Sequence, residues 1–403
     1  MNDIRRTILW VIFGFSMVLL WDKWQVHNGH KATFFPSPAA VTASAPEGGA
    51  SAAQPTAARA STPAAAPAGA AQVPGGEAAT PVARERVTVT SDVLRLEFDG
   101  QGGSLVHGEL LKYPAMEDKA KPFVLFDDSA SRVYQAQTGL IGGAFPTHKT
   151  TMALVPGPRE LKDGEDTLQV RFESPDLGGV KLAKTWTLKR GAYDIAVKHE
   201  VVNTGTAAVS PQLYLQLVRD GNKPAGESSF YSTFTGPAVY TEAKKYQKVE
   251  FKDIENGKVD IEKSASNGYA AMVQHYFASA WLLADGVQRD LFMRKVDTNL
   301  YAVGMITSVG EIAPGQAKAV DARLFAGPQV EKTLESLTPG LELVKDYGMF
   351  TILSKPLYWL LDKIHGVLGN WGWSIIGLVL LLKIAFYWLN AKAYASMAKM
   401  KAI

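Results

Sequence analysis

The feature that most restricts the fold of this chain is a run of 19 residues, Trp371 to Leu389, in which Lys383 is the single charged side chain. A helix of this length and apolarity matches the hydrocarbon thickness of a bilayer. Aromatic residues that favour the membrane interface stand near both ends, Trp373 at one and Trp388 at the other. We therefore predict a transmembrane helix over residues 370–390. The lysines that follow it mark residues 391–403 as the start of a cytoplasmic region.

A second apolar segment lies at the beginning of the chain. Residues 7–21 carry no charge and follow Arg5 and Arg6, so we predict a transmembrane helix over residues 7–24, with residues 1–6 in the cytoplasm. A cleaved signal peptide is the alternative. The residues after Leu20 are bulky and charged, whereas a signal peptidase requires small residues, so the uncleaved anchor is favoured. The chain between the two helices then lies outside the membrane.

The chain between these helices changes in character near residue 84. Residues 25–83 contain a long stretch of Ala, Pro, Ser, Thr and Gly with almost no large apolar side chain, which predicts a disordered tether. From residue 84 to residue 337, apolar residues recur with period two, as Leu94, Leu96 and Phe98 do. Turn signals rich in Gly and Asn separate these runs, as in antiparallel sheets packed face to face. We predict one large all-β domain over residues 84–337.

Residues 338–369 form a further segment. Leu341 and Val344 continue the helical spacing of Leu334, and the following stretch to Leu368 is rich in Leu, Ile and Trp but contains Pro356 and several polar residues. This pattern favours an amphipathic helix that lies in the outer membrane interface. A helix buried in a protein core is the alternative.

The composition excludes several classes of site. The chain has no cysteine, which rules out disulfides, thiolate metal sites and cysteine nucleophiles. A net charge of +3 without a concentrated basic face argues against nucleic-acid binding. No nucleophile elbow, phosphate loop or His-Glu-x-x-His zinc motif occurs in the sequence. We therefore predict no catalytic residue, no cofactor and no metal.

Three features of the β region allow more than one interpretation. His199 is followed by Glu200, but neighbours on a strand point to opposite faces, so a satisfied histidine at the edge of an apolar face is favoured over an acid–base pair. His275 lies among aromatic residues that either pack in the core or line a sugar-binding cleft. The mixed charges of residues 242–263 indicate exposed strands or, alternatively, a protein docking surface.

Lys383 is the residue whose placement in the membrane costs the most free energy. A lysine near the centre of a transmembrane helix is disfavoured by about 2.5–3.5 kcal/mol on insertion scales. One interpretation is that its ammonium reaches the inner headgroups. In the other, Lys383 shares a helix face with Tyr387, Asn390 and Tyr394, and this polar stripe forms a substrate groove in a water-filled cavity shared with further helices. The positive charge would there attract acidic residues of a passing chain.

Longer motifs resemble the YidC/Oxa/Alb family of membrane insertases, in its Gram-negative bacterial branch. These motifs are the first 24 residues with the tether, YQAQTGL (134–140), KTWTLKRG (184–191), AMVQHYFASAW (271–281), AYASMAKM (393–400) and residues 346–376 with DYG, SKPL and GNWGWSII. The resemblance covers essentially the whole chain.

The resemblance implies a periplasmic β-supersandwich similar in shape to sugar mutarotases, an interfacial helix, and a core of five transmembrane helices around a hydrophilic groove. In the family a basic residue in the groove, usually Arg, attracts substrate segments, and Lys383 matches its position. Lysine keeps the charge but loses bidentate pairing with a carboxylate. The family's remaining core helices would follow Ile403, so we expect a longer native protein.

The resemblance also implies a function. It predicts a multi-pass protein of the bacterial inner membrane that inserts other membrane proteins and helps them fold and assemble, alone or with the Sec translocon, rather than an enzyme. The expected partners are nascent inner-membrane proteins, the Sec translocon with its accessory subunits, the ribosome or signal-recognition machinery, and membrane lipids. The alternatives are a membrane-anchored periplasmic domain that binds or modifies carbohydrate, and a periplasmic scaffold that docks to translocon subunits.

Overall fold

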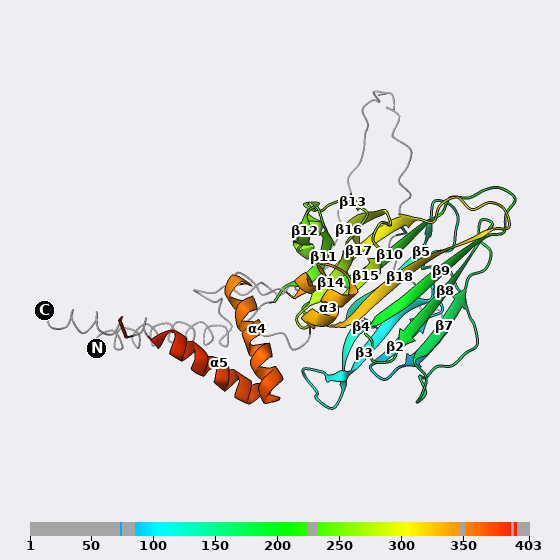
Figure 1. The fold of residues 1–403 in the computed structure, drawn as a ribbon. Coiled ribbons are helices and arrows are strands. Elements are labelled where there is room, and N and C mark those ends of the chain that lie inside the picture. Colours follow the sequence, from blue (N-terminus) through cyan, green and yellow to red (C-terminus); the bar gives the residue numbers. More distant parts are fainter. Residues whose placement is uncertain (1–72, 75–84, 225–232, 346–350, 388–390, 393–403) are drawn as a thin grey trace, which may run out of the picture. The chain divides into compact units, whose positions relative to one another are not determined.

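The structure is a computed structural model that describes residues 73–74, 85–224, 233–345, 351–387 and 391–392 (Figure 1). The chain divides into two units, Met1–Pro67 and Ala68–Ile403, and every described residue belongs to the second. The predicted first helix (7–24), the cytoplasmic ends and all of the predicted tether except Val73 and Pro74 lie outside the described residues, apart from residues 391–392.

Two antiparallel sheets, each with nine described strands, make up the β domain. In spatial order, the first sheet contains β1 (Arg86–Thr90), β2 (Leu94–Asp99), β3 (Ser104–Pro114), β4 (Pro122–Ser129), β5 (Arg132–Ile141), β10 (Gln212–Asp220), β17 (Leu300–Ser308), β16 (Arg289–Asp297) and β13 (Ser264–Ala265). The second contains β12 (Lys245–Lys248), β11 (Thr235–Thr241), β14 (Tyr269–Gln274), β15 (Phe277–Leu283), β18 (Ala317–Pro328), β9 (Asp194–Asn203), β8 (Val180–Lys189), β7 (Thr167–Glu173) and β6 (Ala153–Leu154). The predicted all-β class is confirmed.

The period-two pattern explains which side of each strand is buried. In β2, Leu94, Leu96 and Phe98 point into the space between the sheets and are at most 1% exposed. Arg95 points outward, where its Nη1 lies 2.8 Å from a carboxylate oxygen of Glu109 on β3. Each such buried apolar side chain contributes roughly 1.5–3 kcal/mol, so the alternation places the core between the two sheets.

Large side chains join the sheets across this core. Within the second sheet, the rings of Trp186 on β8 and Trp281 on β15 lie 6.1 Å apart, and the Trp281 indole donates a 3.1 Å hydrogen bond across the core to the backbone oxygen of Gln216 in the first sheet. The hydroxyls of Tyr134 on β5 and Ser279 on β15 share a hydrogen bond of 2.5 Å. The polar ends of Trp281, Tyr134 and Ser279 are thus satisfied across the two sheets, whereas the buried indole nitrogen of Trp186 has no hydrogen-bond partner among the described residues.

Two short helices cover the outer face of the second sheet. They are α3 (Glu331–Leu337) and η1 (Leu341–Val344), and their inward side chains are fully buried (Leu334, Leu341, Val344). Gly340 between them has φ +82°, and a Cβ there would lie 2.4 Å from the Tyr240 ring. The Tyr269 hydroxyl donates a 2.9 Å hydrogen bond to the Gly340 oxygen. Glycine is needed here both for the left-handed backbone and for the close approach.

The charged region from residue 242 to residue 263 is only partly extended. β12 is an edge strand, as predicted, but Phe251–Glu255 forms the short helix α2, so the strand prediction is wrong there. Phe251 packs on Tyr301 with ring centroids 4.7 Å apart, and Ile254 is 6% exposed. Apolar residues three apart lie on one side of a helix. Burial of Phe251 and Ile254 on that side therefore favours a helix here despite the many charged residues.

Two longer helices follow the β domain, α4 (Thr351–Leu368) and α5 (Trp371–Ala385). α4 falls within the predicted interfacial region, and α5 falls within the predicted transmembrane segment. Within the described part of the chain, no helix combines the length and apolarity needed to cross a membrane.

Candidate functional site

The α4–α5 hairpin carries the predicted site. Its turn contains Gly369 at φ +64° and Asn370, whose side chain accepts a 3.2 Å hydrogen bond from the Trp373 backbone N–H and so caps α5. The rings of His365 and Trp371 stack with centroids 3.8 Å apart across the turn. The cap and the stacked rings position the start of α5 against the end of α4.

Polar contacts join α4 to the chain around α3 and η1. Lys332 on α3 lies 2.9 Å from Asp362 on α4, and Glu331 lies 3.4 Å from Lys355. The ammonium of Lys345 lies 3.6 Å from the centroid of the Tyr358 ring. Exposed pairs of this kind are screened by solvent, so they orient α4 without holding it strongly.

The apolar side chains of α5 are exposed around most of the helix. Those that are 47% to 65% exposed include Ile375, Ile376, Val379, Leu380, Leu381 and Ile384. Leu378 and Leu382 are half-buried, and Ser374 is fully buried and donates a 2.7 Å hydrogen bond to the Asn370 oxygen. A helix that is apolar on all sides is typical of a membrane span or of the centre of a large protein.

The structure describes two of the four predicted groove residues. Lys383 is exposed in the last turn of α5, and Tyr387, 73% exposed, lies just beyond the C-cap residue Phe386. The two are four residues apart, about one helical turn. No hydrogen bond or ion pair joins Lys383 to another residue that the structure describes. Asn390 and Tyr394 lie outside the described residues.

A second polar group lies between the sheets and was missed by sequence reasoning. Lys184 on β8 is fully buried, and its Nζ donates to the backbone oxygens of Gly102, at 2.6 Å, and Thr138, at 2.7 Å. Burial lowers the pKa of Lys184 to about 7. The side chain of Thr138 also shares a 3.0 Å hydrogen bond with Nε2 of His199.

The placement of His199 corrects one prediction and agrees with another. His199 is fully buried inside the sandwich rather than at the edge of an apolar face. Its burial, followed by the charge of Lys184, lowers its pKa to about 3. Glu200 points to the other side and pairs with Arg171, so the two neighbours do not act together. With neither His199 nor Lys184 open to solvent, this group serves packing rather than substrate binding.

His275 forms a hairpin turn instead of packing in the core. It lies with Tyr276 between β14 and β15, has φ +37°, and its Nδ1 lies 2.9 Å from the Thr233 hydroxyl. Tyr276 is 64% exposed. The adjacent Phe277 stacks on Phe123 with ring centroids 4.0 Å apart. Of the aromatic residues in this motif, Tyr276 is thus exposed at the tip of the turn, whereas Phe277 is stacked on Phe123 at the boundary of the core.

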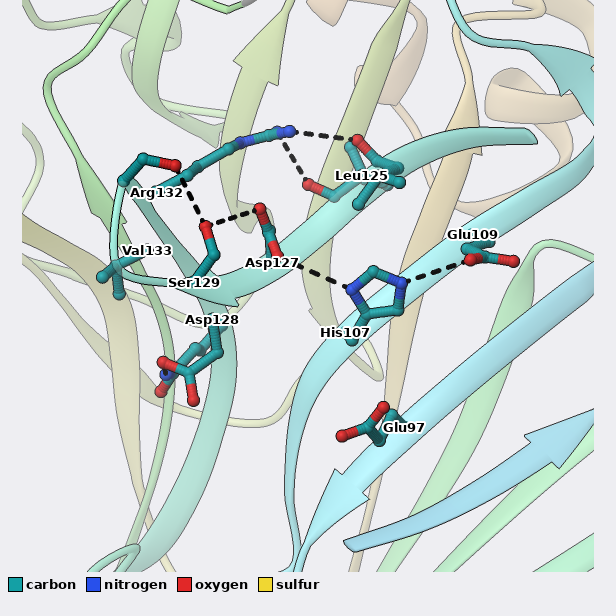
Figure 2. A network of polar contacts seen from close by, with 12 residues as sticks. Glu97, His107, Glu109, Leu125, Asp127, Asp128, Ser129, Arg132 and Val133 are labelled. Carbon is teal, nitrogen blue, oxygen red and sulfur yellow. Dashed lines mark hydrogen bonds and ion pairs between the residues drawn. The ribbon is translucent and has the colours of Figure 1, made fainter. Parts of the chain in front are cut away.

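A polar network lies on the exposed side of the first sheet (Figure 2). His107 on β3 lies between Glu109, at 3.4 Å, and Asp127 on β4, at 3.6 Å. Arg132 on β5 donates to the backbone oxygens of Val124 and Leu125 on β4. No group of three side chains suited to hold a metal ion occurs among the described residues. We interpret the network as a set of cross-strand contacts.

A large two-sheet domain that continues into helices with exposed apolar side chains is compatible with a membrane protein whose folded domain lies outside the bilayer. Residues 86–360 match the family model described as the YidC periplasmic domain. The chain belongs to the YidC family of membrane protein insertases.

Curated relatives support this membership along almost the whole chain. A membrane protein insertase YidC from Cupriavidus metallidurans is 52% identical over 399 residues, which cover 99% of this chain and 71% of the relative. Those from Janthinobacterium sp. and Bordetella pertussis are 49% and 52% identical and cover 100% of this chain and 71% and 72% of their own lengths. Membership therefore identifies the substrates as membrane proteins and assigns the β domain to the periplasm.

Two solved structures show a distant likeness to the β domain. A galactose mutarotase-like protein from Lactobacillus casei has 9% identity and a TM-score of 0.39, with 60% of this chain and 100% of that chain covered. A galactose mutarotase related enzyme from Lactobacillus acidophilus has 8% identity and a TM-score of 0.40, with 60% and 97% covered. A likeness this distant supports no conclusion about activity.

Proposed function

We propose that the chain receives its substrates on the face of α5 that carries Lys383 and Tyr387, and that this face continues through Asn390 and Tyr394. The observation that carries the proposal is the isolation of Lys383. It is the single charge in an apolar helix and has no polar partner among the described residues. An acidic residue that flanks an incoming apolar segment would supply the missing partner, because opposite charges attract more strongly in a groove bordered by lipid than in bulk water.

The topology proposed for the chain follows from the same helices. Residues 370–390 and 7–24 cross the inner membrane, both ends face the cytoplasm, and residues 25–83 connect the first helix to the periplasmic domain. α4 lies in the outer interface. Its exposed apolar side chains support this location, since Leu353 is 61%, Trp359 60% and Val367 85% exposed. The two nine-stranded sheets support the description of the β domain as a supersandwich.

The proposed partners are nascent inner-membrane proteins and, for a share of substrates, the Sec translocon with its accessory subunits. Contacts with the ribosome or the signal-recognition machinery would involve parts of the relatives that this chain does not match, since the chain covers 71% of the Cupriavidus metallidurans relative. No nucleotide, metal or covalent intermediate is required, because the groove acts by lowering the cost of moving a polar flank out of water.

Site-specific photocrosslinking tests the proposed face. A photoreactive residue is placed at Lys383, at Tyr387 or at Leu381, and inner-membrane vesicles with the chain in its full native context are incubated with a stalled nascent membrane protein. Leu381 is a matched control because it is 47% exposed and lies on the opposite side of α5. We expect adducts from positions 383 and 387 only. Equal adducts from all three positions would contradict a defined substrate face.

A further inference from the structure

Val73 belongs to the region predicted as a disordered tether, yet it is only 5% exposed. It packs on the outer face of the first sheet, opposite the face that forms the core, because Leu213 and Leu215 of β10 point inward while Tyr214 between them points outward. Side chains from four strands surround Val73, namely Ile141, Tyr214, Phe292 and Ile306.

Two glycines shape the floor of this site. A Cβ at Gly139 would lie 2.4 Å from the hydroxyl oxygen of Tyr214, and a Cβ at Gly304 would lie 2.7 Å from a ring carbon of Phe292. Each glycine therefore leaves room for an aromatic ring close to the sheet. The rings lie close enough to the sheet to contact Val73 without a steric clash.

Arg294 on β16 recognises the backbone of the docked residues. Its Nη1 donates a 2.6 Å hydrogen bond to the oxygen of Val73, and its Nη2 donates a 3.3 Å hydrogen bond to the oxygen of Pro74. The guanidinium also lies 5.5 Å from the centroid of the Phe292 ring. Pro74 restricts Val73 to an extended backbone and has no N–H. The site therefore binds two carbonyl oxygens and one β-branched side chain.

The distance across the sheet is compatible with this docking. β1 is at one edge of the first sheet, whereas β16 is next to the other edge, seven strand spacings away. At about 4.8 Å per spacing this is roughly 34 Å. The 13 residue steps from Val73 to Arg86 can span at most roughly 45 Å. The chain before β1 is thus long enough to place Val73 beside β16.

We propose that the outer face of the first sheet is a binding site for an extended β-branched residue followed by proline, and that its occupant is Val73–Pro74 of the same chain. Docking moves the point where the tether leaves the β domain from β1 to β16. The span that remains between the predicted anchor, which ends at Trp24, and the domain is then residues 25–72. The point on the periplasmic domain at which the tether restrains it depends on this site.

The absence of cysteine from the chain makes a direct test possible. A single thiol is introduced by Val73→Cys in the membrane-embedded chain, and its rate of maleimide labelling is compared with the rate in urea. We expect native labelling to be at least about tenfold slower, because a buried site reacts through local opening. Adding Arg294→Gln should raise the native rate at least about threefold. Lys295→Gln, the same charge change on the same strand, should leave it unchanged.

Equal rates in buffer and urea would overturn the proposal, as would an Arg294→Gln rate no different from that of Lys295→Gln. A second measurement does not depend on the arginine. The pair Val73→Cys and Ile306→Cys should form a disulfide readily under mild oxidation, whereas Val73→Cys with Leu177→Cys, a 37% exposed position near β8, should not. Equal yields from the two pairs would also overturn it, and thermal melting checks that each variant is folded.

Discussion

Lys184 shows how one buried residue links the stability of the β domain to pH. Its ammonium donates hydrogen bonds to two backbone oxygens. The cause of its pKa shift is desolvation by burial, and no carboxylate contributes to the shift. Because its pKa falls from 10.5 to about 7 on folding, the unfolded chain binds more protons than the folded chain between these values. Stability should therefore rise with pH in this window, and the cost of burying the charge is complete below pH 7.

The prediction is measured by urea unfolding at pH 7, 8 and 9. The contribution of Lys184 to the free energy of unfolding should increase by up to about 1.4 kcal/mol per pH unit. Lys184→Met should remove this slope even if it lowers stability at every pH by leaving two oxygens unpaired. Lys189→Met, at an exposed position on the same strand, is the control and should keep the slope. An unchanged slope in Lys184→Met would show that the lysine does not titrate in this range.

Single residues also show the limits of sequence reasoning. The opposite faces of His199 and Glu200 were predictable because strand periodicity is local. The burial of Lys184 beside His199 was not, since it depends on Thr138, which reaches both from the other sheet. Val73 was missed for the same reason. Its pocket is built from four strands that are far from it in the sequence.

At the scale of elements, the pairings of strands that are distant in the sequence are the ones that sequence patterns cannot supply. Period-two alternation predicted strands, and Gly-containing turns predicted where several of them end, because both signals lie within a few residues. The short helix α2 was missed because its apolar pair is only two residues among many charges. The pairing of β5 with β10, or of β9 with β18, joins distant segments and leaves no local signal.

The link between β5 and β15 gives a prediction at this scale. Ser279→Ala should lower the free energy of unfolding by about 1–3 kcal/mol, because the buried Tyr134 hydroxyl keeps only a 3.3 Å contact to the Met272 oxygen. Tyr134→Phe combined with Ser279→Ala should cost less than the sum of the two single changes, since no hydroxyl is then left unpaired. Chemical unfolding of the four proteins in a double-mutant cycle measures this coupling. Strictly additive costs would mean that the hydrogen bond does not join the sheets.

At the scale of the whole molecule, the proposed function predicts how the charge on α5 affects insertion. Lys383→Glu should reduce insertion most for substrates whose translocated flanks are acidic, because attraction becomes repulsion, while Lys383→Arg should retain activity. Lys189→Glu makes the same charge change on the β domain and should have no effect. Protease protection of newly made substrates in membrane vesicles gives the inserted fraction. Normal insertion of acidic-flank substrates by Lys383→Glu would contradict the proposal and favour the other interpretation, in which the Lys383 ammonium reaches the headgroups.

The burial of η1 has a mechanical consequence for the β domain. Val344 is fully buried and α4 begins at Thr351, so the C-terminal connection between the folded domain and the next helix is a few residues long. The N-terminal connection, measured from Trp24 to Val73, is 49 residue steps. With both anchors in the bilayer as proposed, a force that pulls the domain away from the membrane loads the short connection first. Under tension the domain would rotate about its C-terminal connection. The longer N-terminal connection would limit only the extent of this rotation.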